Sequence, residues 1–130
     1  MADQMSDLAE VTRLVQMYID GADGDADLLR QAFHPSATMT GHIGSAVDTL
    51  VPIEHFISMV EARPGLAGPE YATSIRSIDL TGDAGVAVLV ETDYFGCDFV
   101  DYFTVVRIDG RWQITAKTYA HTGGEPPKGA

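Results

Sequence analysis

The 130-residue sequence contains a single cysteine, Cys97, which excludes an intrachain disulfide bond and a zinc site built from several thiolates. Basic residues are also few, because 8 Lys and Arg stand against 19 Asp and Glu and give a formal charge of −11. Such a charge repels phosphate backbones and anionic membranes, so we expect no nucleic-acid partner and no membrane partner. No apolar run approaches the ~20 residues of a membrane span, and the first residues lack the features of a secretory signal. We therefore expect a cytoplasmic protein.

The motifs of cofactor and metal binding are missing as well. The sequence has neither the GxxxxGK[ST] loop that holds nucleotide phosphates nor the GxGxxG turn of dinucleotide-binding folds. Its four histidines show no HxH or HExxH spacing, so we expect no metal site. We also expect no cofactor, and any catalysis would depend on the side chains of the chain itself.

Length and composition predict one globular domain. A chain of this size buries roughly two thirds of its unfolded surface, and 45% of its residues are hydrophobic. No repeat or linker interrupts it, and only the end, GGEPPKGA, is typical of a loose segment. We predict a single domain over residues 1–122 and a flexible C-terminal tail over residues 123–130.

Apolar periodicity predicts helices in the first half of the chain. A stripe with helical spacing follows Ser6 and Asp7, either of which can cap the helix, and Gly21 fits its end. Asp25 caps a second, shorter helix, which Pro35 ends because the residue before a proline disfavours helical conformation.

The remaining elements are predicted to be mainly strands. Strands are expected over residues 37–43, 46–51, 70–80 and 86–95, with a third helix starting near Pro52 and a loop over residues 63–69. Ile75 and Ile78 fall on opposite faces of their strand, so we expect a β-bulge there. Helices first and a long antiparallel meander last predict an α+β domain.

The stretch from Phe99 to His121 reads as a long β-hairpin. Its centre, Asp109-Gly110, is the dipeptide that most readily adopts the positive φ pair of a type I′ turn. Counting outward pairs Ile108 with Arg111, Val105 with Ile114, Phe103 with Ala116, and Asp101 with Thr118. Alternation then assigns to the core face Phe99, Asp101, Phe103, Val105, Trp112, Ile114, Ala116 and Ala120. Lys117 falls on the outer face.

The same counting extends one strand back. A turn at Gly96-Cys97 would place Thr92 opposite Asp101, so that Thr92 and Thr118 flank this carboxylate across the sheet. The core face of that strand would carry Val86, Val88, Val90, Thr92 and Tyr94.

Asp101 is the one charge on the predicted core face, where an unpaired charge is expensive. Two interpretations stay open. Asp101 is satisfied by Thr92, Thr118 or a buried backbone amide, or it projects into an apolar cavity. In the second case its pKa is raised, and it acts as a general acid, a general base or a neutral hydrogen-bond donor.

The order of elements resembles the nuclear transport factor 2-like superfamily. The sequence is most similar to small bacterial proteins called "putative lumazine-binding" or SnoaL-like, and the likeness runs from about Leu8 to His121. Its most specific pieces are YIDGADGD, FHPSA and the IDGRW hairpin. The resemblance implies a cone-shaped α+β barrel, in which N-terminal helices pack on a strongly curved antiparallel sheet with a pocket between them. It also implies a homodimer through the outer sheet face, which here carries Tyr102, Thr104, Val106, Thr115 and Tyr119.

The same superfamily includes ketosteroid isomerases, which place an oxyanion-stabilising tyrosine in the segment that Tyr18 occupies. Those enzymes carry a carboxylate base at the end of the first strand, where this chain has Thr40-Gly41-His42, so steroid isomerisation by that constellation is disfavoured. His42 is either a substitute proton carrier or an exposed loop histidine, and Tyr18 equally fits plain core packing. The candidate catalytic residues are Asp101, Tyr18 and His42.

Two functions of different class follow. In the first, an apolar cone binds a small apolar or aromatic ligand without changing it, and the family label suggests a pteridine. In the second, a cofactor-free isomerase, cyclase or dehydratase uses Asp101 as general acid or base. A cavity too small for any ligand is a third possibility. Candidate ligand-binding residues are Thr92, Phe103, Trp112, Thr118, Met39 and Phe56.

Overall fold

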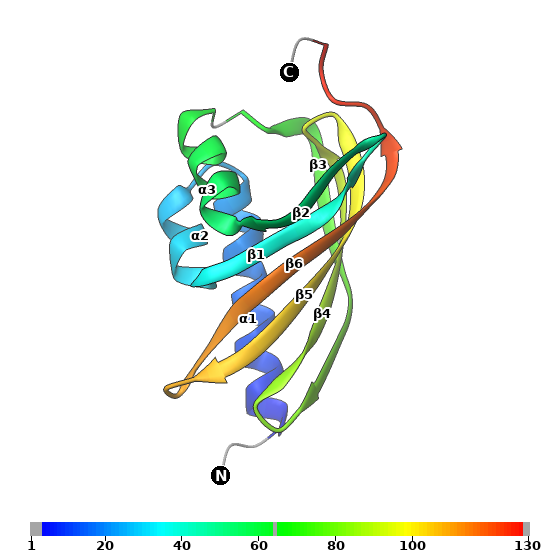
Figure 1. The fold of residues 1–130 in the computed structure, drawn as a ribbon. Helices are drawn as coiled ribbons and strands as arrows, with labels where there is room; N and C mark the ends of the chain where they lie inside the picture. Colours follow the sequence, from blue (N-terminus) through cyan, green and yellow to red (C-terminus); the bar gives the residue numbers. More distant parts are fainter. Residues whose placement is uncertain (1–3, 64, 129–130) are drawn as a thin grey trace.

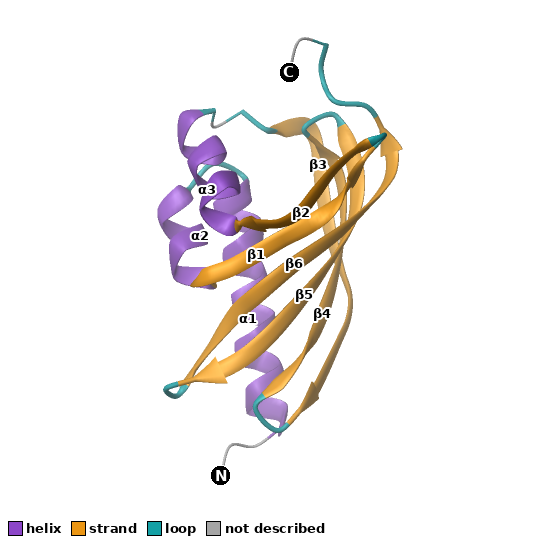
Figure 2. Cartoon of the chain, viewed as in Figure 1, coloured by secondary structure: helices purple, strands orange, loops and turns teal. Residues whose placement is uncertain are grey.

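The structure is a computed structural model that describes residues 4–63 and 65–128. The chain runs through α1 (Gln4–Ala22), α2 (Ala26–Ala32), β1 (Phe33–Ile43), β2 (Ala46–Pro52), α3 (Ile53–Ala62), β3 (Ala67–Thr81), β4 (Ala84–Tyr94), β5 (Cys97–Ile108) and β6 (Arg111–Gly124). The strands form one sheet in the order β2-β1-β6-β5-β4-β3, in which only β1 and β6 run parallel. Figure 1 shows a long, curved sheet, and Figure 2 shows the helices gathered on one side of it. The predicted α+β class is confirmed, although the cone is not a closed barrel, because β2 and β3 are open edges.

The predicted helix starts are correct in two cases of three. Asp25 caps α2, since its Oδ1 accepts hydrogen bonds from the backbone N–H groups of Asp27 and Leu28 at 3.1 and 3.3 Å. Pro52 directly precedes α3. The start at Ser6 or Asp7 is wrong, because α1 already includes Gln4.

Asp7 does not cap the helix but pairs with a distant arginine. It is buried in the first turn of α1, where its Oδ1 accepts a hydrogen bond from Arg107 Nη1 at 2.6 Å. The guanidinium of Arg107 also donates from Nε to Asp83 at 2.9 Å. A long-range ion pair to β5 therefore sets the position of this carboxylate, and no local pattern signals it.

Two segments predicted as loops are shorter than expected, because strands extend into them. The predicted loop over residues 63–69 gives way to β3 at Ala67, and residue 64 lies outside the described residues. The predicted tail overlaps β6, because Gly124 still pairs with Cys97. Residues 129–130 of that tail also lie outside the described residues, and the domain boundary at residue 122 stays a prediction.

The hairpin turn of β5 and β6 is confirmed, but the register beyond it is not. Asp109 and Gly110 have φ values of 51° and 77°, and Val105 pairs with Ile114 as expected. A β-bulge then shifts the register, because β6 has one extra residue opposite the Thr104/Val105 step. Phe103 therefore pairs with Lys117, and Asp101 with Tyr119, where the sequence pattern predicted Ala116 and Thr118.

The bulge reverses which residues of β6 face the helices. Lys117 and Tyr119 are 6% and 8% exposed, whereas Thr118 and Ala120 are exposed. The predicted placement of Lys117 and Tyr119 on the outer face is therefore wrong. An uninterrupted alternation was assumed, and one inserted residue is enough to invert it.

The register of β4 is also corrected. The turn before β5 consists of Phe95 and Gly96, with φ values of 53° and 74°, and not of Gly96-Cys97. A β-bulge between Glu91 and Tyr94 shifts the register by a further residue, so Leu89 pairs with Asp101 and the two faces of β4 are exchanged. The inner face of β4 carries Ala87, Leu89, Glu91 and, beyond this bulge, Tyr94. Of the predicted core face only Tyr94 remains, and Thr92 is exposed.

The predicted bulge in β3 is confirmed, since the β3–β4 register shifts between Ile75 and Ser77. No helix of the described residues combines the length and the apolar character needed to cross a bilayer.

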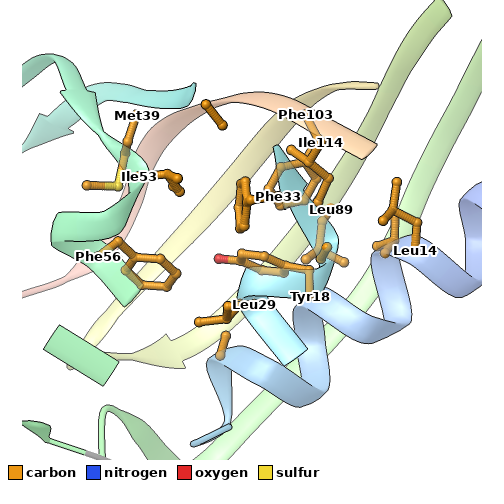
Figure 3. Close-up of a cluster of buried hydrophobic side chains, with 14 of the residues drawn as sticks. Leu14, Tyr18, Leu29, Phe33, Met39, Ile53, Phe56, Leu89, Phe103 and Ile114 are labelled. Atoms are coloured by element: carbon orange, nitrogen blue, oxygen red, sulfur yellow. The ribbon is translucent and has the colours of Figure 1, made fainter. Parts of the chain in front are cut away.

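The core lies between the helices and the inner sheet face. Its centre is Tyr18 of α1, which is completely buried and whose ring centroid lies 4.7 Å from that of Phe103 and 5.9 Å from that of Phe33. Figure 3 shows Tyr18 among Phe33, Phe56 and Leu29. Side chains from all layers thus converge on one tyrosine, directly beside the site described next.

Candidate functional site

A cavity of about 190 Å³ opens between α3, the β1–β2 pair and the inner face of the sheet. It is larger than apolar protein cavities of about 150 Å³ that take up benzene. Its lining consists of Met39, Ile43, Asp48, Phe56, Met59, Tyr94, Phe95, Phe99, Asp101, Lys117 and Tyr119. Ile43, Asp48, Met59 and Phe95 are half-buried and mark the mouth, whereas the other lining residues are buried.

Asp101 of β5 belongs to the buried part of this lining. Its side chain is 0% exposed, and neither carboxyl oxygen has a hydrogen-bond partner among the described residues. Thr92 and Thr118, the predicted partners, are exposed and make no hydrogen bond to it. Such an unpaired buried group is uncommon in native structures, and it calls for a functional or structural explanation.

Glu91 of β4 is a second buried carboxyl group, and sequence reasoning missed it. Its Oε2 accepts a hydrogen bond from the Tyr71 hydroxyl at 2.7 Å, and its Oε1 accepts a longer one, of 3.5 Å, from the Tyr18 hydroxyl. Glu91 is 1% exposed. Either turn alone, Gly96-Cys97 or Phe95-Gly96, would leave Glu91 on the outer face, and the β-bulge between Glu91 and Tyr94 is what turns it inward.

The surroundings of Asp101 change its protonation. Burial raises the pKa of Asp101 well above its ordinary value, and the neighbouring Glu91 raises it further, while the Lys117 ammonium and the neighbouring Tyr18 hydroxyl lower it. Asp101 therefore retains its proton at pH values where an exposed aspartate has lost it. Burial and Glu91 likewise raise the pKa of Tyr18 and of Tyr71, so both phenols remain hydrogen-bond donors.

Lys117 of β6 is the third polar group of the site and the second that the sequence pattern misplaced. Its Nζ lies 4.0 Å from the ring centroid of Phe56, 5.2 Å from that of Tyr18 and 5.7 Å from that of Tyr119. Aromatic faces attract a cation in this way. Lys117 forms no ion pair with a carboxylate of the described residues. Because Asp101 pairs with Tyr119 and Phe103 with Lys117, the carboxyl and the amine are diagonal neighbours on one face.

The rim of the cavity is fixed by two polar contacts of β6. The Tyr119 hydroxyl donates to Asp48 Oδ2 of β2 at 2.5 Å. The His121 Nδ1 accepts from the Gly44 N–H at 3.0 Å, so its other nitrogen, 2.8 Å from the Gly124 carbonyl oxygen, is the one positioned to donate. A Cβ at Gly41 would lie 2.6 Å from the Tyr119 ring, so a glycine is required where β1 passes this tyrosine.

The structure brings together only part of the predicted site. Met39, Phe56 and Asp101 line the cavity. Tyr18 lies in the core behind the cavity, with its hydroxyl directed at Glu91. His42 is exposed on β1 and is not part of the lining.

The other predicted ligand-binding residues lie elsewhere. Phe103 is buried in the core and Trp112 is buried near the hairpin turn, with the Arg107 guanidinium 5.1 Å from the centroid of its ring. Thr92 and Thr118 are exposed. None of these four lines the cavity. Within the described residues no group of three or more His, Cys, Asp or Glu side chains is arranged to hold a metal ion.

An open cone of three helices on a six-stranded curved sheet is the architecture of nuclear transport factor 2-like proteins. The sequence model of the family described as "Putative lumazine-binding" matches residues 6–120, so the chain belongs to this family. No curated protein matches its sequence.

Solved structures confirm the fold. An NTF2-like protein of unknown function from Shewanella baltica superimposes with a TM-score of 0.83 at 23% identity, covering 95% of this chain and 100% of that one. A second, from Silicibacter pomeroyi, gives 0.82 at 27% identity, covering 93% and 100%. A third, from Methylobacillus flagellatus, gives 0.79 at 23% identity, covering 90% and 93%. These likenesses establish the fold, whereas the function has to be argued from the site.

Proposed function

We propose that this protein binds a small, mostly apolar molecule in the cavity and holds one polar group of that molecule at Asp101. The observation that carries the proposal is the pair of carboxyl oxygens of Asp101, which are buried in the cavity wall without a hydrogen-bond partner. The family description, lumazine-binding, supports a ligand-binding role.

The chemistry of the lining sets the class of ligand. The walls are aromatic or thioether side chains, chiefly Met39, Phe56, Met59, Tyr94 and Phe99, which favour a flat ring. A buried polar group that lacks a partner costs about 1–3 kcal/mol, and a ligand that supplies one recovers this free energy. Because Asp101 retains its proton, it donates a hydrogen bond, and the matching ligand group is an acceptor such as a carbonyl oxygen.

The test compares two probes that differ in this acceptor. Acetophenone carries a ring and a carbonyl group, whereas ethylbenzene has nearly the same shape and no acceptor. Binding measured by protein-detected NMR titration should favour acetophenone by about tenfold, which corresponds to roughly 1.4 kcal/mol. Equal affinities, or no saturable binding of either probe, would contradict the proposal.

A matched pair of variants locates the binding. Ile43→Phe narrows the mouth of the cavity, while Val47→Phe makes a comparable change at a 55% exposed position of β2 outside the lining. Acetophenone binding should weaken at least tenfold in Ile43→Phe and should be unchanged in Val47→Phe. Equal loss in both variants would place the binding outside this cavity.

A cofactor-free enzyme is the second candidate function. The observation that favours it is the protonated Asp101 in the cavity wall, because a carboxyl group that retains its proton can act as a general acid on a bound molecule. Isomerisation, cyclisation or dehydration of a small apolar substrate fits this group. Asp101→Asn separates the two functions, since proton transfer should slow on the order of 10²-fold or more while ligand binding persists.

A further inference from the structure

Lysine is rare in this chain and one of its two copies is buried in the cavity wall. The sequence contains Lys117 and Lys128 only. Lys128 is exposed near the C-terminus, whereas Lys117 is 6% exposed and lines the cavity. Lysine usually extends its amine to solvent, so a buried copy is an exception.

The surroundings of Lys117 differ from those of a structural ion pair. Its Nζ lies 4.0 Å from the ring centroid of Phe56, and no described carboxylate forms a salt bridge with it. A buried salt bridge would hold the amine as a fixed ammonium ion. Here the amine borders empty space on one side and a proton-carrying group, Asp101, on the neighbouring strand.

We propose that Lys117 forms a reversible imine with an aldehyde or ketone group of a molecule bound in the cavity. This inference rests on the proposed function, because the carbonyl compound must first occupy the cavity. It names a covalent site and a substrate class, which are small apolar carbonyl compounds.

The chemistry needs no oxidant, reductant or metal. Once its ammonium has released one proton to water at the mouth, the amine of Lys117 attacks the carbonyl carbon. A C–N bond forms and the oxygen takes the proton of the Asp101 carboxyl group. The nitrogen then gives a proton back to the Asp101 carboxylate, and the same carboxyl protonates the hydroxyl group, which leaves as water. The products are the protonated imine, one water molecule and the Asp101 carboxylate.

The cavity also suits the product. A protonated imine is a cation, and it occupies the place of the ammonium against the faces of Phe56 and Tyr18. The buried walls limit access of bulk water, which is the reagent that reverses the reaction.

Reductive trapping tests the proposal directly. The protein is incubated with benzaldehyde and sodium cyanoborohydride, which converts an imine into a stable secondary amine. Intact-mass measurement counts the benzyl groups, and peptide mapping assigns them among Lys117, Lys128 and the α-amino group. We expect saturable labelling of Lys117, at least tenfold faster than that of Lys128. Labelling confined to Lys128 and the α-amino group would overturn the proposal.

Variants and a binding control complete the test. Lys117→Met keeps the length of the side chain without an amine and should remove the fast label, whereas Lys128→Arg should retain it. If Lys117→Met fails to fold, the peptide map of the wild-type protein still decides. Benzyl alcohol, which has the same ring and no carbonyl group, is titrated in parallel by NMR.

The combined outcomes separate the two proposals. Saturable binding of benzyl alcohol without label at Lys117 overturns imine formation and leaves the binding function intact. Absence of both binding and label overturns both. Label at Lys117 that benzyl alcohol suppresses by competition supports both.

Discussion

Folding buries the carboxyl group of Asp101 completely and gives it no hydrogen-bond partner among the described residues. An exposed aspartate in the unfolded chain loses its proton near pH 3.9, whereas burial and Glu91 keep Asp101 protonated to higher pH in the folded protein. Above about pH 4 the folded state thus binds a proton that the unfolded state has released. The stability that this proton supports is complete below pH 4 and is lost as the pH rises through the raised pKa.

Asp101→Asn should therefore stabilise the protein at neutral pH. The neutral amide removes the titration, so the gain over wild type should grow as the pH rises from about 4 to 8, reaching roughly 1–3 kcal/mol. Urea unfolding at several pH values measures this difference. Asp79→Asn, at an exposed position of β3, is the control and should change the free energy of unfolding by less than about 0.5 kcal/mol at every pH. A gain that is constant with pH would show that Asp101 does not titrate as described.

At the scale of the strand, one extra residue in β6 decides which side chains reach the cavity. The alternation of inner and outer residues is regular up to Ile114 and resumes inverted at Ala116, so Lys117 points inward. Without the bulge, Thr118 would be shielded and Lys117 exposed to solvent.

Cysteine reactivity distinguishes these two registers. Thr118→Cys should react with Ellman's reagent at least tenfold faster than Lys117→Cys, because Thr118 is exposed and Lys117 is 6% exposed. The wild-type protein supplies the background, since its one cysteine, Cys97, is buried and burial raises the pKa of its thiol. The reverse order of rates would restore the register expected from simple alternation.

The same element shows what sequence patterns do and do not determine. Asp109-Gly110 fixes the turn because few dipeptides accept two positive φ values, and pairs close to the turn follow from it. Asp101 was assigned to the core face correctly because it lies on β5 itself, on the same side as Phe103 and Val105. Lys117 lies beyond the bulge. Counting residues outward from the turn assigns it to the wrong face, because a bulged strand and a regular strand have the same kinds of residues.

Glu91 was missed for a related reason. The turn at Phe95-Gly96 shifts β4 by two residues along β5 without changing its faces, whereas the β-bulge between Glu91 and Tyr94 inverts them. Only tertiary contacts, such as the hydrogen bond from Tyr71 to Glu91, distinguish the two registers. The fold could thus be predicted from the order of elements, whereas two of the three polar groups of the site depended on single-residue shifts.

At the scale of the whole molecule, the outer face of the sheet is apolar over β4 and β5. Val88 and Val100 lie on it at 8% exposure each and are not part of the main core cluster, while Val86 and Tyr102 beside them are 38% and 42% exposed. With Tyr119 now on the inner face, the outer surface over β4 and β5 combines valine side chains with Tyr102 and Thr104. We propose, in line with the superfamily resemblance, that a second copy of the chain covers it in a two-fold symmetric dimer.

Two matched substitutions test this assembly. Val86→Lys places a charge on the outer face and should convert the dimer into a monomer, because burying an unpaired ammonium in each half of an apolar interface is costly. Val47→Lys makes the same change at the 55% exposed edge strand β2, away from that face, and should leave the dimer intact. Light scattering coupled to size-exclusion chromatography gives the mass of each species. A wild-type protein that is monomeric at all accessible concentrations would refute the dimer. Dissociation by both substitutions would indicate an interface near β2, close to the mouth of the cavity.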